Sequence, residues 1–404
     1  MKKFLSFLVF LGFISGALFS YTFGSIRVSL LDITLGLFVL GNLIFVKKNS
    51  QNTLVFFIKT VGPFLLIACF SLLFQIFKLK PVEMGISALY MLRFLGYASS
   101  LYFVAKDQDL KHTGIWWLWL SGISISVLGL IQYVLYPNLR NLSYLGWDPH
   151  QYRLFSTLLD PNFTGIILVL TLILSMYIIQ HKNTQLRIFV IVASFGPVIA
   201  LFLTYSRGAF VAFLATVFVW TLVSKRWKIM GGLVVIFVAS LFFLPRPSGE
   251  GVNLLRTISI YARIENTQEA WNLFTSSPVI GYGFNTLRFV RQVPASEMES
   301  PETAHSGGGF HNGWLTLLTT TGIIGVIGYL WIWRKILAVT QKENKQFLML
   351  SLTAIFTHSF FDNSLFYPWV MLWMWVVAGS GLKINRPSYE RGRIPSLRKR
   401  GLRP

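Results

Sequence analysis

The sequence predicts an all-α, polytopic transmembrane helical bundle of about 12 spans, and three observations support that fold class. Of the 404 residues, 54% are hydrophobic and only 13% are charged, which leaves too few charges to solvate the surface of an ordinary globular protein. Most of the apolar residues occur in runs of about 17 to 25, the length that crosses a bilayer. One long polar segment, residues 245–312, interrupts these runs and is expected to form an external loop that contains short helices.

The expected spans are defined by the residues at which the apolar runs begin. They start near Phe4, Val28, Leu54, Met84, Gly114, Asn162, Leu186, Gly208, Ile229, Gly313, Phe347 and Ser364. Only the tripeptide 205–207 separates the seventh run from the eighth, and we place a break there because an arginine inside a continuous span is costly. The first run resembles a signal peptide, but no small-residue cleavage site leads from it into a soluble domain, so we expect a membrane helix.

The basic residues indicate a membrane partner and an orientation. Lys and Arg outnumber Asp and Glu by 36 to 15, yet no nucleic-acid-binding motif accompanies them, so we expect anionic membrane lipids and no nucleic acid as partners. With both chain ends in the cytoplasm, the cytoplasmic segments carry about twice as many Lys and Arg residues as the external ones. This bias predicts that loops 137–161 and 245–312 lie on the opposite, external side.

Within the long external loop, residues 258–274 mix apolar and charged side chains at near-helical spacing. Ser277, Pro278 and two glycines, Gly281 and Gly283, then break the pattern. We therefore expect a short helix near the outer membrane interface, followed by a turn.

Four residues at the external membrane boundary are candidates for chemistry: Arg153, Arg207, Arg263 and His311. Arginine stays charged and offers a planar fork of donors, so several arginines that converge could hold a pyrophosphate without a metal. For a single arginine, snorkelling to lipid phosphates or capping a helix is the simpler explanation. For Arg207 we favour function, because it lies in a tight connection between two apolar runs. A neutral His311 could accept a proton from a sugar hydroxyl near physiological pH.

Two polar groups near the same boundary have a structural and a functional explanation, and the sequence leaves both open. Residues 160–162, Asp-Pro-Asn, form a good helix start with Asp160 or Asn162 as the cap. Asp362 and Asn363, with His358 just before them, either form a helix-ending turn or line the site.

Inside the bundle, Asp32 and Arg93 are expected to form a structural ion pair. We expect no metal, because His305 and His311 lack a third ligand at a recognised spacing. We also expect no cofactor, because no Walker loop, dinucleotide fingerprint or nucleophile elbow is present.

The ordered set of motifs resembles the O-antigen ligase and polymerase superfamily of bacterial membrane proteins. The matching pieces, in chain order, are Arg153-Leu154-Phe155-Ser156, Asp160-Pro161-Asn162, Ser206-Arg207-Gly208-Ala209, Arg263, Ser277-Pro278-Val279-Ile280-Gly281-Tyr282-Gly283, His311-Asn312, Leu315 and Thr321-Gly322-Ile323-Ile324-Gly325. The resemblance runs from roughly Tyr152 to Trp375. It implies N-terminal transmembrane helices over 1–151, a ligase- or polymerase-like core over 152–382 and a basic cytoplasmic tail over 383–404.

What the resemblance implies is a metal-independent glycosyltransferase in the bacterial cytoplasmic (inner) membrane, with its active site on the periplasmic or extracellular side. Members of this superfamily take a glycan from an undecaprenyl-pyrophosphate carrier, without a nucleotide sugar, and pass it to an acceptor glycolipid or glycan. By motif, Arg207 and Arg263 would hold the pyrophosphate, Arg153 would assist, and His311 would act as the base on the acceptor hydroxyl. Asn162 and Asn312 are expected to contribute to substrate binding.

Two other functions stay open at this point. A surface-polysaccharide polymerase would use the same chemistry with a second carrier-linked repeat unit as the acceptor, and the sequence offers no discriminator between it and a ligase. A transporter of lipid-linked glycans is the minor alternative. It would need ionisable residues at the membrane centre and paired, broken-helix halves, and only Asp32 and Arg93 are candidates.

Overall fold

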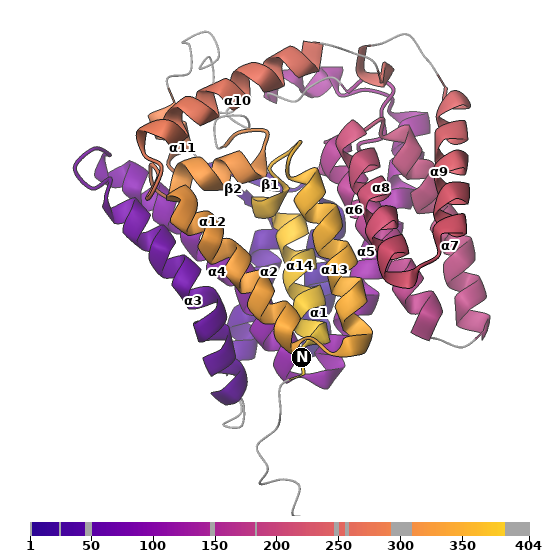
Figure 1. Cartoon of the computed structure of the whole chain (residues 1–404), viewed down its shortest axis with the longest axis horizontal. Helices are drawn as coiled ribbons and strands as arrows, with labels where there is room; N and C mark the ends of the chain where they lie inside the picture. Colours follow the sequence, from indigo (N-terminus) through magenta and orange to yellow (C-terminus); the bar gives the residue numbers. More distant parts are fainter. Residues whose placement is uncertain are drawn as a thin grey trace, which may run out of the picture.

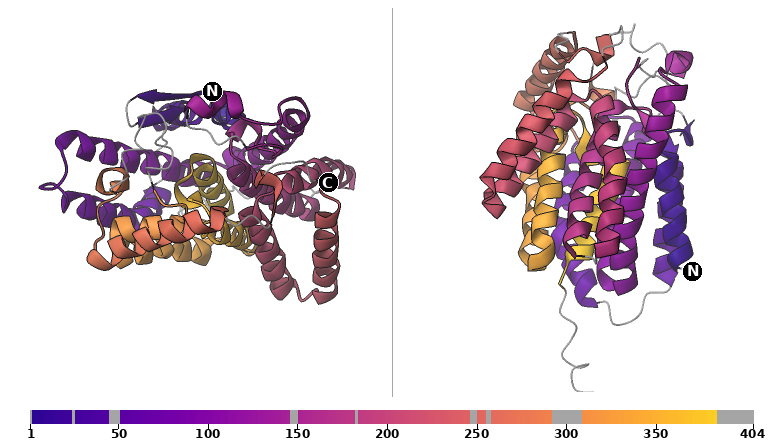
Figure 2. Two further views of the ribbon diagram at one scale, coloured as in Figure 1. Left: turned by 90° about the horizontal axis from the view of Figure 1, so that it is seen from above. Right: turned by 90° about the vertical axis from the view of Figure 1, so that its right-hand side faces the viewer.

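The structure, a computed structural model, describes residues 2–23, 26–44, 51–145, 150–181, 184–245, 250–254, 258–291 and 309–383. Each of the expected apolar segments forms a helix, and the long helices run roughly parallel as a bundle (Figures 1 and 2). Their bounds are α1 Lys2–Ser15, α2 Leu30–Ile44, α3 Gln51–Leu73, α4 Pro81–Lys106, α5 Gln108–Leu135, α6 Pro161–His181, α7 Thr184–Leu203, α8 Arg207–Ser224, α9 Trp227–Phe242, α12 Gly313–Val339, α13 Lys342–His358 and α14 Pro368–Gly381.

Seven of the helices in the described residues, α3 to α8 and α12, are long and apolar enough to cross a membrane. Helices α2 and α9 are shorter apolar helices. The helical membrane bundle is therefore confirmed, whereas a count of about 12 spans stays a prediction. The expected break between the seventh and eighth runs is confirmed, because α7 ends at Leu203 and α8 begins at Arg207.

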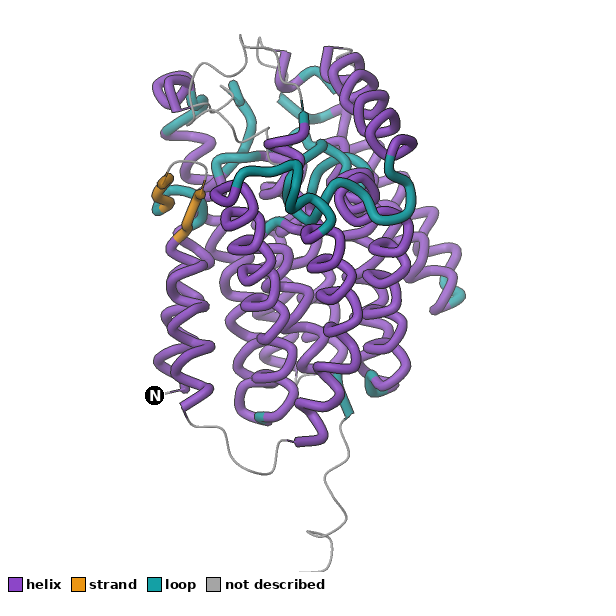
Figure 3. Tube along the Cα trace, turned by 90° about the vertical axis from the view of Figure 1, so that its left-hand side faces the viewer, coloured by secondary structure: helices purple, strands orange, loops and turns teal. Residues whose placement is uncertain are grey.

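The remaining elements gather at one end of the bundle, which we call the loop-bearing end (Figure 3). Helix α10, Ile258–Ser276, lies across this end of the bundle (Figure 1), and its presence confirms the helix expected over 258–274. Helix α11, Leu287–Val290, follows it. Strands β1 (Ser20–Phe23) and β2 (Ile26–Ser29) form an antiparallel hairpin that the sequence analysis did not predict.

At the other end of the bundle, α1 begins and α14 ends (Figure 1). The Lys2 ammonium forms an ion pair with Asp107, which lies between α4 and α5. Thr340, just after α12, forms an isolated antiparallel bridge with Leu382, just after α14. The described parts of loops 137–161 and 245–312 lie at the loop-bearing end, opposite to the start of α1 (Figure 3).

Helix α14 is the central helix, and it is apolar on every side. Its buried residues include Trp373 and Trp375, and it packs against α4, α5 and α13. Large apolar side chains instead cover the outside of the bundle, where Leu66 is 72% exposed and Phe195 62%. Contiguous apolar surface of this extent is typical of a protein that faces lipid.

Helix α12 is broken at Gly322, whose backbone is non-helical with φ 65° and ψ −171°. Residues 277–283 dock into the break: the Tyr282 and Gly283 amides donate to the carbonyls of Thr319 and Thr320, each at 2.9 Å. These bonds occupy carbonyls that the broken helix leaves unpaired. A Cβ atom on Gly322 would lie 2.0 Å from the Val279 carbonyl oxygen. The motifs 277–283 and 321–325 thus form one docking joint between the loop and α12.

Candidate active site

Arg207 lies at the loop-bearing end because the chain turns sharply between α7 and α8. Ser206 caps α8: its hydroxyl accepts from the Ala209 amide at 3.3 Å and donates to Asn162 Oδ1 at 3.0 Å. Arg207 is the first residue of the helix, and its Nη1 donates to the Leu254 carbonyl at 3.4 Å. The turn therefore fixes the backbone of Arg207, while its guanidinium extends toward Leu254, in the segment that follows α9.

Arg263 approaches the same place from α10, the helix that crosses the end of the bundle. Both arginines lie around His358 and Asp362, since a Cβ atom on Gly208, next to Arg207, would lie 3.4 Å from His358 Nε2, and Arg263 contributes electrostatically at Arg207. Arg263 Nη2 also lies 3.8 Å from Asp362 Oδ2, with the Arg263 side chain 30% exposed. Two guanidinium groups held together in this way form an arrangement suited to an anion with several oxygens, such as a pyrophosphate.

His358 and Asp362 lie beneath the two arginines, at and just after the end of α13. His358 is fully buried, and its Nδ1 is hydrogen-bonded to Ser364 Oγ at 2.6 Å. Its Nε2 lies 3.9 Å from Asp362 Oδ2, and among the described residues neither of these two atoms has a hydrogen-bond partner. Gly208 makes this packing possible, because a Cβ atom there would lie 3.4 Å from His358 Nε2 and 3.0 Å from Phe361 Cβ.

Asp362 has an unusual charge state for an aspartate. Burial raises the pKa of its carboxyl, Arg263 lowers it, Asp160 raises it and Arg153 lowers it, and together they bring the pKa to about 8. The carboxyl is therefore mostly protonated at neutral pH. In that state it does not neutralise Arg263, so the guanidinium keeps its full charge for a ligand.

Arg153 and Asn162 join the start of α6 to the turn before α8. Arg153 is only 5% exposed, and it donates from Nε to the Thr204 carbonyl at 2.9 Å and from Nη2 to Asn162 Oδ1 at 3.2 Å. Asn162 Oδ1 thus accepts from both Arg153 and Ser206. Asp160 is the cap of α6, since its Oδ1 accepts from the Asn162 amide at 2.6 Å, which confirms one of the two expected caps.

His311 is exposed and lies just before α12. Its backbone amide donates to the side chain of Asn266 at 3.0 Å, and Asn266 lies on α10 one turn after Arg263. Asn312 caps α12, because its Oδ1 accepts from the amides of Trp314 and Leu315 at 2.9 and 3.0 Å. His311 and Arg263 are therefore carried by two elements that are directly hydrogen-bonded to each other.

The structure thus brings Arg207 and Arg263 together with His358 and Asp362, and it attaches His311 through α10. The sequence analysis named His358 and Asp362 only as one of two explanations for a turn. It missed Asn266 altogether, because a polar residue on a short amphipathic helix carries no sequence signal that separates a contact from ordinary solvation.

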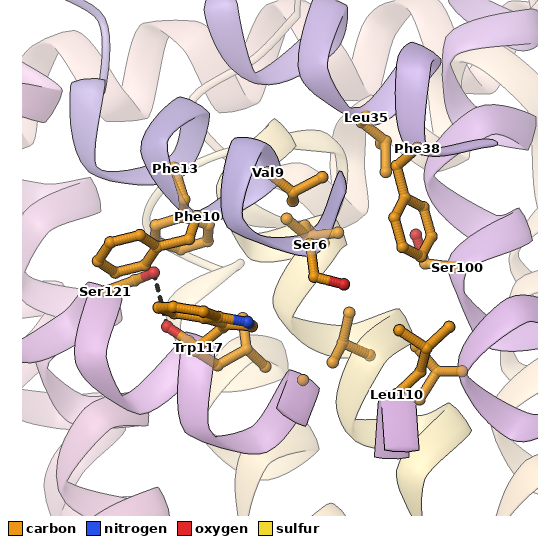
Figure 4. A pocket seen from close by; sticks show the side chains of 15 residues that line it. Ser6, Val9, Phe10, Phe13, Leu35, Phe38, Ser100, Leu110, Trp117 and Ser121 are labelled. Carbon is orange, nitrogen blue, oxygen red and sulfur yellow. Dashed lines mark hydrogen bonds between the residues drawn. The ribbon is translucent and has the colours of Figure 1, made fainter. Parts of the chain in front are cut away.

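Inside the bundle, an apolar cavity lies between α1, α2, α4, α5 and α14 (Figure 4). Phe10, Phe13 and Trp117 are among the residues that line it. None of the candidate residues that the structure describes lines this cavity. Among the described residues there is also no group of three His, Cys, Asp or Glu side chains that could hold a metal ion, and His305 lies outside them.

Comparisons with known proteins connect this arrangement to a family. Residues 189–330 match the family model described as O-antigen ligase. The chain is also similar to the O-antigen ligase of Salmonella typhimurium (strain LT2), with 26% identity over 149 residues. That match covers 35% of this chain and 37% of the relative. The resemblance inferred from the motifs is confirmed, and the segment matched by the family model contains Arg207, Arg263 and His311.

Proposed function

We propose that this chain, a member of the O-antigen ligase superfamily, transfers a glycan from an undecaprenyl-pyrophosphate carrier to an acceptor hydroxyl on the outer face of the bacterial inner membrane. The observation that carries the proposal is the convergence of two arginine-bearing elements on buried His358 and Asp362. Arg263 Nη2 lies 3.8 Å from Asp362 Oδ2, and a Cβ atom on Gly208, the residue after Arg207, would lie 3.4 Å from His358 Nε2. Guanidinium groups gathered at one place match the several oxygens of a pyrophosphate on a lipid carrier.

In this mechanism the two guanidinium groups stabilise the leaving group. As the bond between the anomeric carbon and the pyrophosphate oxygen breaks, its electron pair moves to that oxygen, and the fixed charges of Arg207 and Arg263 stabilise the negative charge. His311 accepts the proton of the acceptor hydroxyl, whose oxygen forms the new bond to the anomeric carbon. Attack from the face opposite to the leaving group inverts the configuration of that carbon.

Arg153, Asn162 and Asn312 position the elements that carry Arg207 and His311. Arg153 and Asn162 hold the α7–α8 turn against α6 and so fix the backbone position of Arg207. Arg153 also adds positive charge beneath the site. Asn312 orders the first turn of α12, next to His311.

We propose a ligase as the first function and a surface-polysaccharide polymerase as the alternative, because both use the same donor chemistry. A ligase would accept a membrane glycolipid, whereas a polymerase would accept a second carrier-linked glycan. Offering each acceptor separately to the reconstituted protein distinguishes the two functions.

The central experiment compares Arg207→Gln and Arg263→Gln with Arg187→Gln in vesicles that contain a polyprenyl-pyrophosphate-linked glycan and an acceptor. Arg187 is an exposed arginine in the first turn of α7, at the far end of the bundle, and serves as the matched control. We expect each site variant to lose transfer on the order of 10²-fold or more and the control to keep it. Full activity of both site variants, or movement of the glycan across the vesicle without any glycosidic bond, would overturn the proposal.

A further inference from the structure

Arg291, the residue just after α11, contacts α10 and the chain before α12 at the same time. Its Nε and Nη2 donate to the two carboxylate oxygens of Glu269 on α10, at 2.8 and 2.7 Å. Its Nη1 donates to the Gly309 carbonyl at 3.3 Å, and its Cζ lies 4.8 Å from the centre of the Phe310 ring. One guanidinium group therefore joins α10 to the two residues that precede His311.

A guanidinium group suits this role because its donors point in fixed directions. Two of its N–H groups bind a carboxylate side by side, another binds a carbonyl, and its flat face packs on an aromatic ring. A lysine ammonium carries the same charge but cannot make all of these contacts together. The Arg291 side chain is only 12% exposed, compared with 36% for Glu269, so water competes little for the guanidinium.

Phe310 is held by α10, α11 and α12 together. Its side chain is 1% exposed and packs in a small apolar cluster with Ala270 on α10 and Leu287 on α11. Its amide donates to Thr316 Oγ1, on α12, at 2.9 Å. The residue before His311 is therefore fixed through both its side chain and its backbone, and Arg291 covers its ring.

His311 follows directly, and its backbone is attached to the same helix. Its amide donates to Asn266 at 3.0 Å, and Asn266 lies on α10 between Arg263 and Glu269. The two residues of α10 that attach the 309–311 segment, Asn266 and Glu269, are one helical turn apart, and Arg263 lies one turn before them. The imidazole rotates around only two bonds of its side chain, so a fixed backbone limits where its nitrogens lie.

We propose that Arg291 is a positioning residue, which holds His311 at a constant spacing from Arg263. The proposal rests on the proposed function, in which Arg263 holds the pyrophosphate of the donor and His311 accepts the proton of the acceptor hydroxyl. These two groups act on opposite faces of one anomeric carbon, so an error in their spacing slows the displacement without weakening donor binding. Arg291 acts through α10 and the backbone before His311, and it takes no part in the chemistry itself.

The test combines transfer kinetics with hydrogen–deuterium exchange of the full chain in detergent. The site variants are Arg291→Met, which removes the guanidinium, and Arg291→Lys, which keeps the charge without the fork. Glu269 is 36% exposed, so its carboxylate stays solvated in Arg291→Met and the variant should fold. Arg334→Met is the matched control, because Arg334 is an exposed arginine of α12 whose Cζ also lies near an aromatic ring, 6.0 Å from the centre of Trp331.

We expect Arg291→Met to lower kcat by about 10- to 100-fold, with the KM for the donor nearly unchanged, Arg291→Lys in between and the control like wild type. Amide exchange in peptides that contain His311 should become about tenfold or more faster in Arg291→Met, because hydrogen bonds to a charged group are lost. Peptides of α3 and α4 should exchange as in wild type. If Arg291→Met does not fold, Arg291→Lys carries the same comparison.

Unchanged exchange around His311 overturns the proposal, as does an unchanged kcat in a variant whose exchange is faster. A rise in the donor KM that accounts for the whole loss of activity also overturns it, because Arg291 would then contribute to donor binding. Absence of glycan transfer by the wild type would instead count against the proposed function, and the exchange measurement would still test whether Arg291 holds His311.

Discussion

Arg263 and Asp362 lie 3.8 Å apart, from Nη2 to Oδ2, and connect the helix that crosses the loop-bearing end to the turn between α13 and α14. The Asp362 carboxyl has a pKa of about 8 because it is buried. It is therefore neutral below that pH and negatively charged above it. Since only the charged form neutralises Arg263, Asp362 sets how strongly Arg263 attracts an anion.

The first prediction concerns pH. As the pH rises through about 8, ionised Asp362 pairs with Arg263 and the KM for the lipid-linked donor increases, by roughly three- to tenfold. Asp362→Asn cannot ionise, so its KM should stay low and flat over the same range. Steady-state kinetics of both proteins at a series of pH values measures this. Asp109→Asn, at an exposed aspartate near the far end, is the control, and the same pH profile for Asp362→Asn and wild type would contradict the assignment.

The second prediction separates the base from the anion site. His311→Ala should lower kcat by about 10²- to 10⁴-fold while leaving the KM for the donor nearly unchanged, because in the proposed mechanism His311 acts on the acceptor hydroxyl. The side chain is exposed, so the variant should fold and melt like wild type. His112→Ala, at an exposed histidine near the start of α5, controls for loss of an imidazole. A rise in donor KM without a fall in kcat would place His311 in donor binding instead.

The third prediction tests the docking joint at the break of α12. Gly322→Ala should destabilise the protein, by about 1–3 kcal/mol from the left-handed backbone alone, and its Cβ would lie 2.0 Å from the Val279 carbonyl oxygen. Thermal unfolding in detergent would report the loss. Gly231→Ala is the matched control, because Gly231 lies inside α9, where an added Cβ atom would meet no neighbouring atom of the described residues within 4 Å, and alanine favours a helix. Equal unfolding temperatures for the two variants would show that the packing of residues 277–283 against Gly322 contributes no measurable stability.

The fourth prediction concerns the ion pair between Asp32 and Arg93, whose side chains are 14% and 22% exposed. Removing one partner, as in Asp32→Asn or Arg93→Met, leaves the other charge largely buried and should cost about 3–5 kcal/mol. Combining the two substitutions should cost much less than the sum of the single effects. A double-mutant cycle from unfolding in detergent measures this coupling, and strictly additive effects would mean that the pair contributes no coupling energy.

The helices could be predicted from the sequence because each apolar run is continuous and long. The break before Arg207 and the helix over 258–274 were also predictable, since an arginine inside a span is costly and mixed apolar and charged residues at helical spacing mark a surface helix. The ion pair of Asp32 and Arg93 is likewise confirmed, because two opposite charges within apolar runs have few other ways to be satisfied.

The details of the site could not be predicted in the same way. Residues 20–23 and 26–29 pair as very short strands, whose sequence looks like the edge of a neighbouring apolar run. The break of α12 at Gly322 depends on the packing of residues 277–283, which no local pattern encodes. The raised pKa of Asp362 depends on burial by α10 and α13 together, so it follows from the tertiary structure alone.

The attachment of α10 has a mechanical consequence for substrate entry. It is tied to α12 at two points: Asn266 accepts from the His311 amide, and residues 277–283 are anchored at the break around Gly322. Because α10 is attached at two points to α12 and the residue before it, α10 cannot move away without breaking one of these contacts. We therefore expect the spacing between Arg263 and His311 to be preserved during the proposed reaction. If the proposed function holds, we expect the lipid carrier to enter on the side of α8 and the α13–α14 turn.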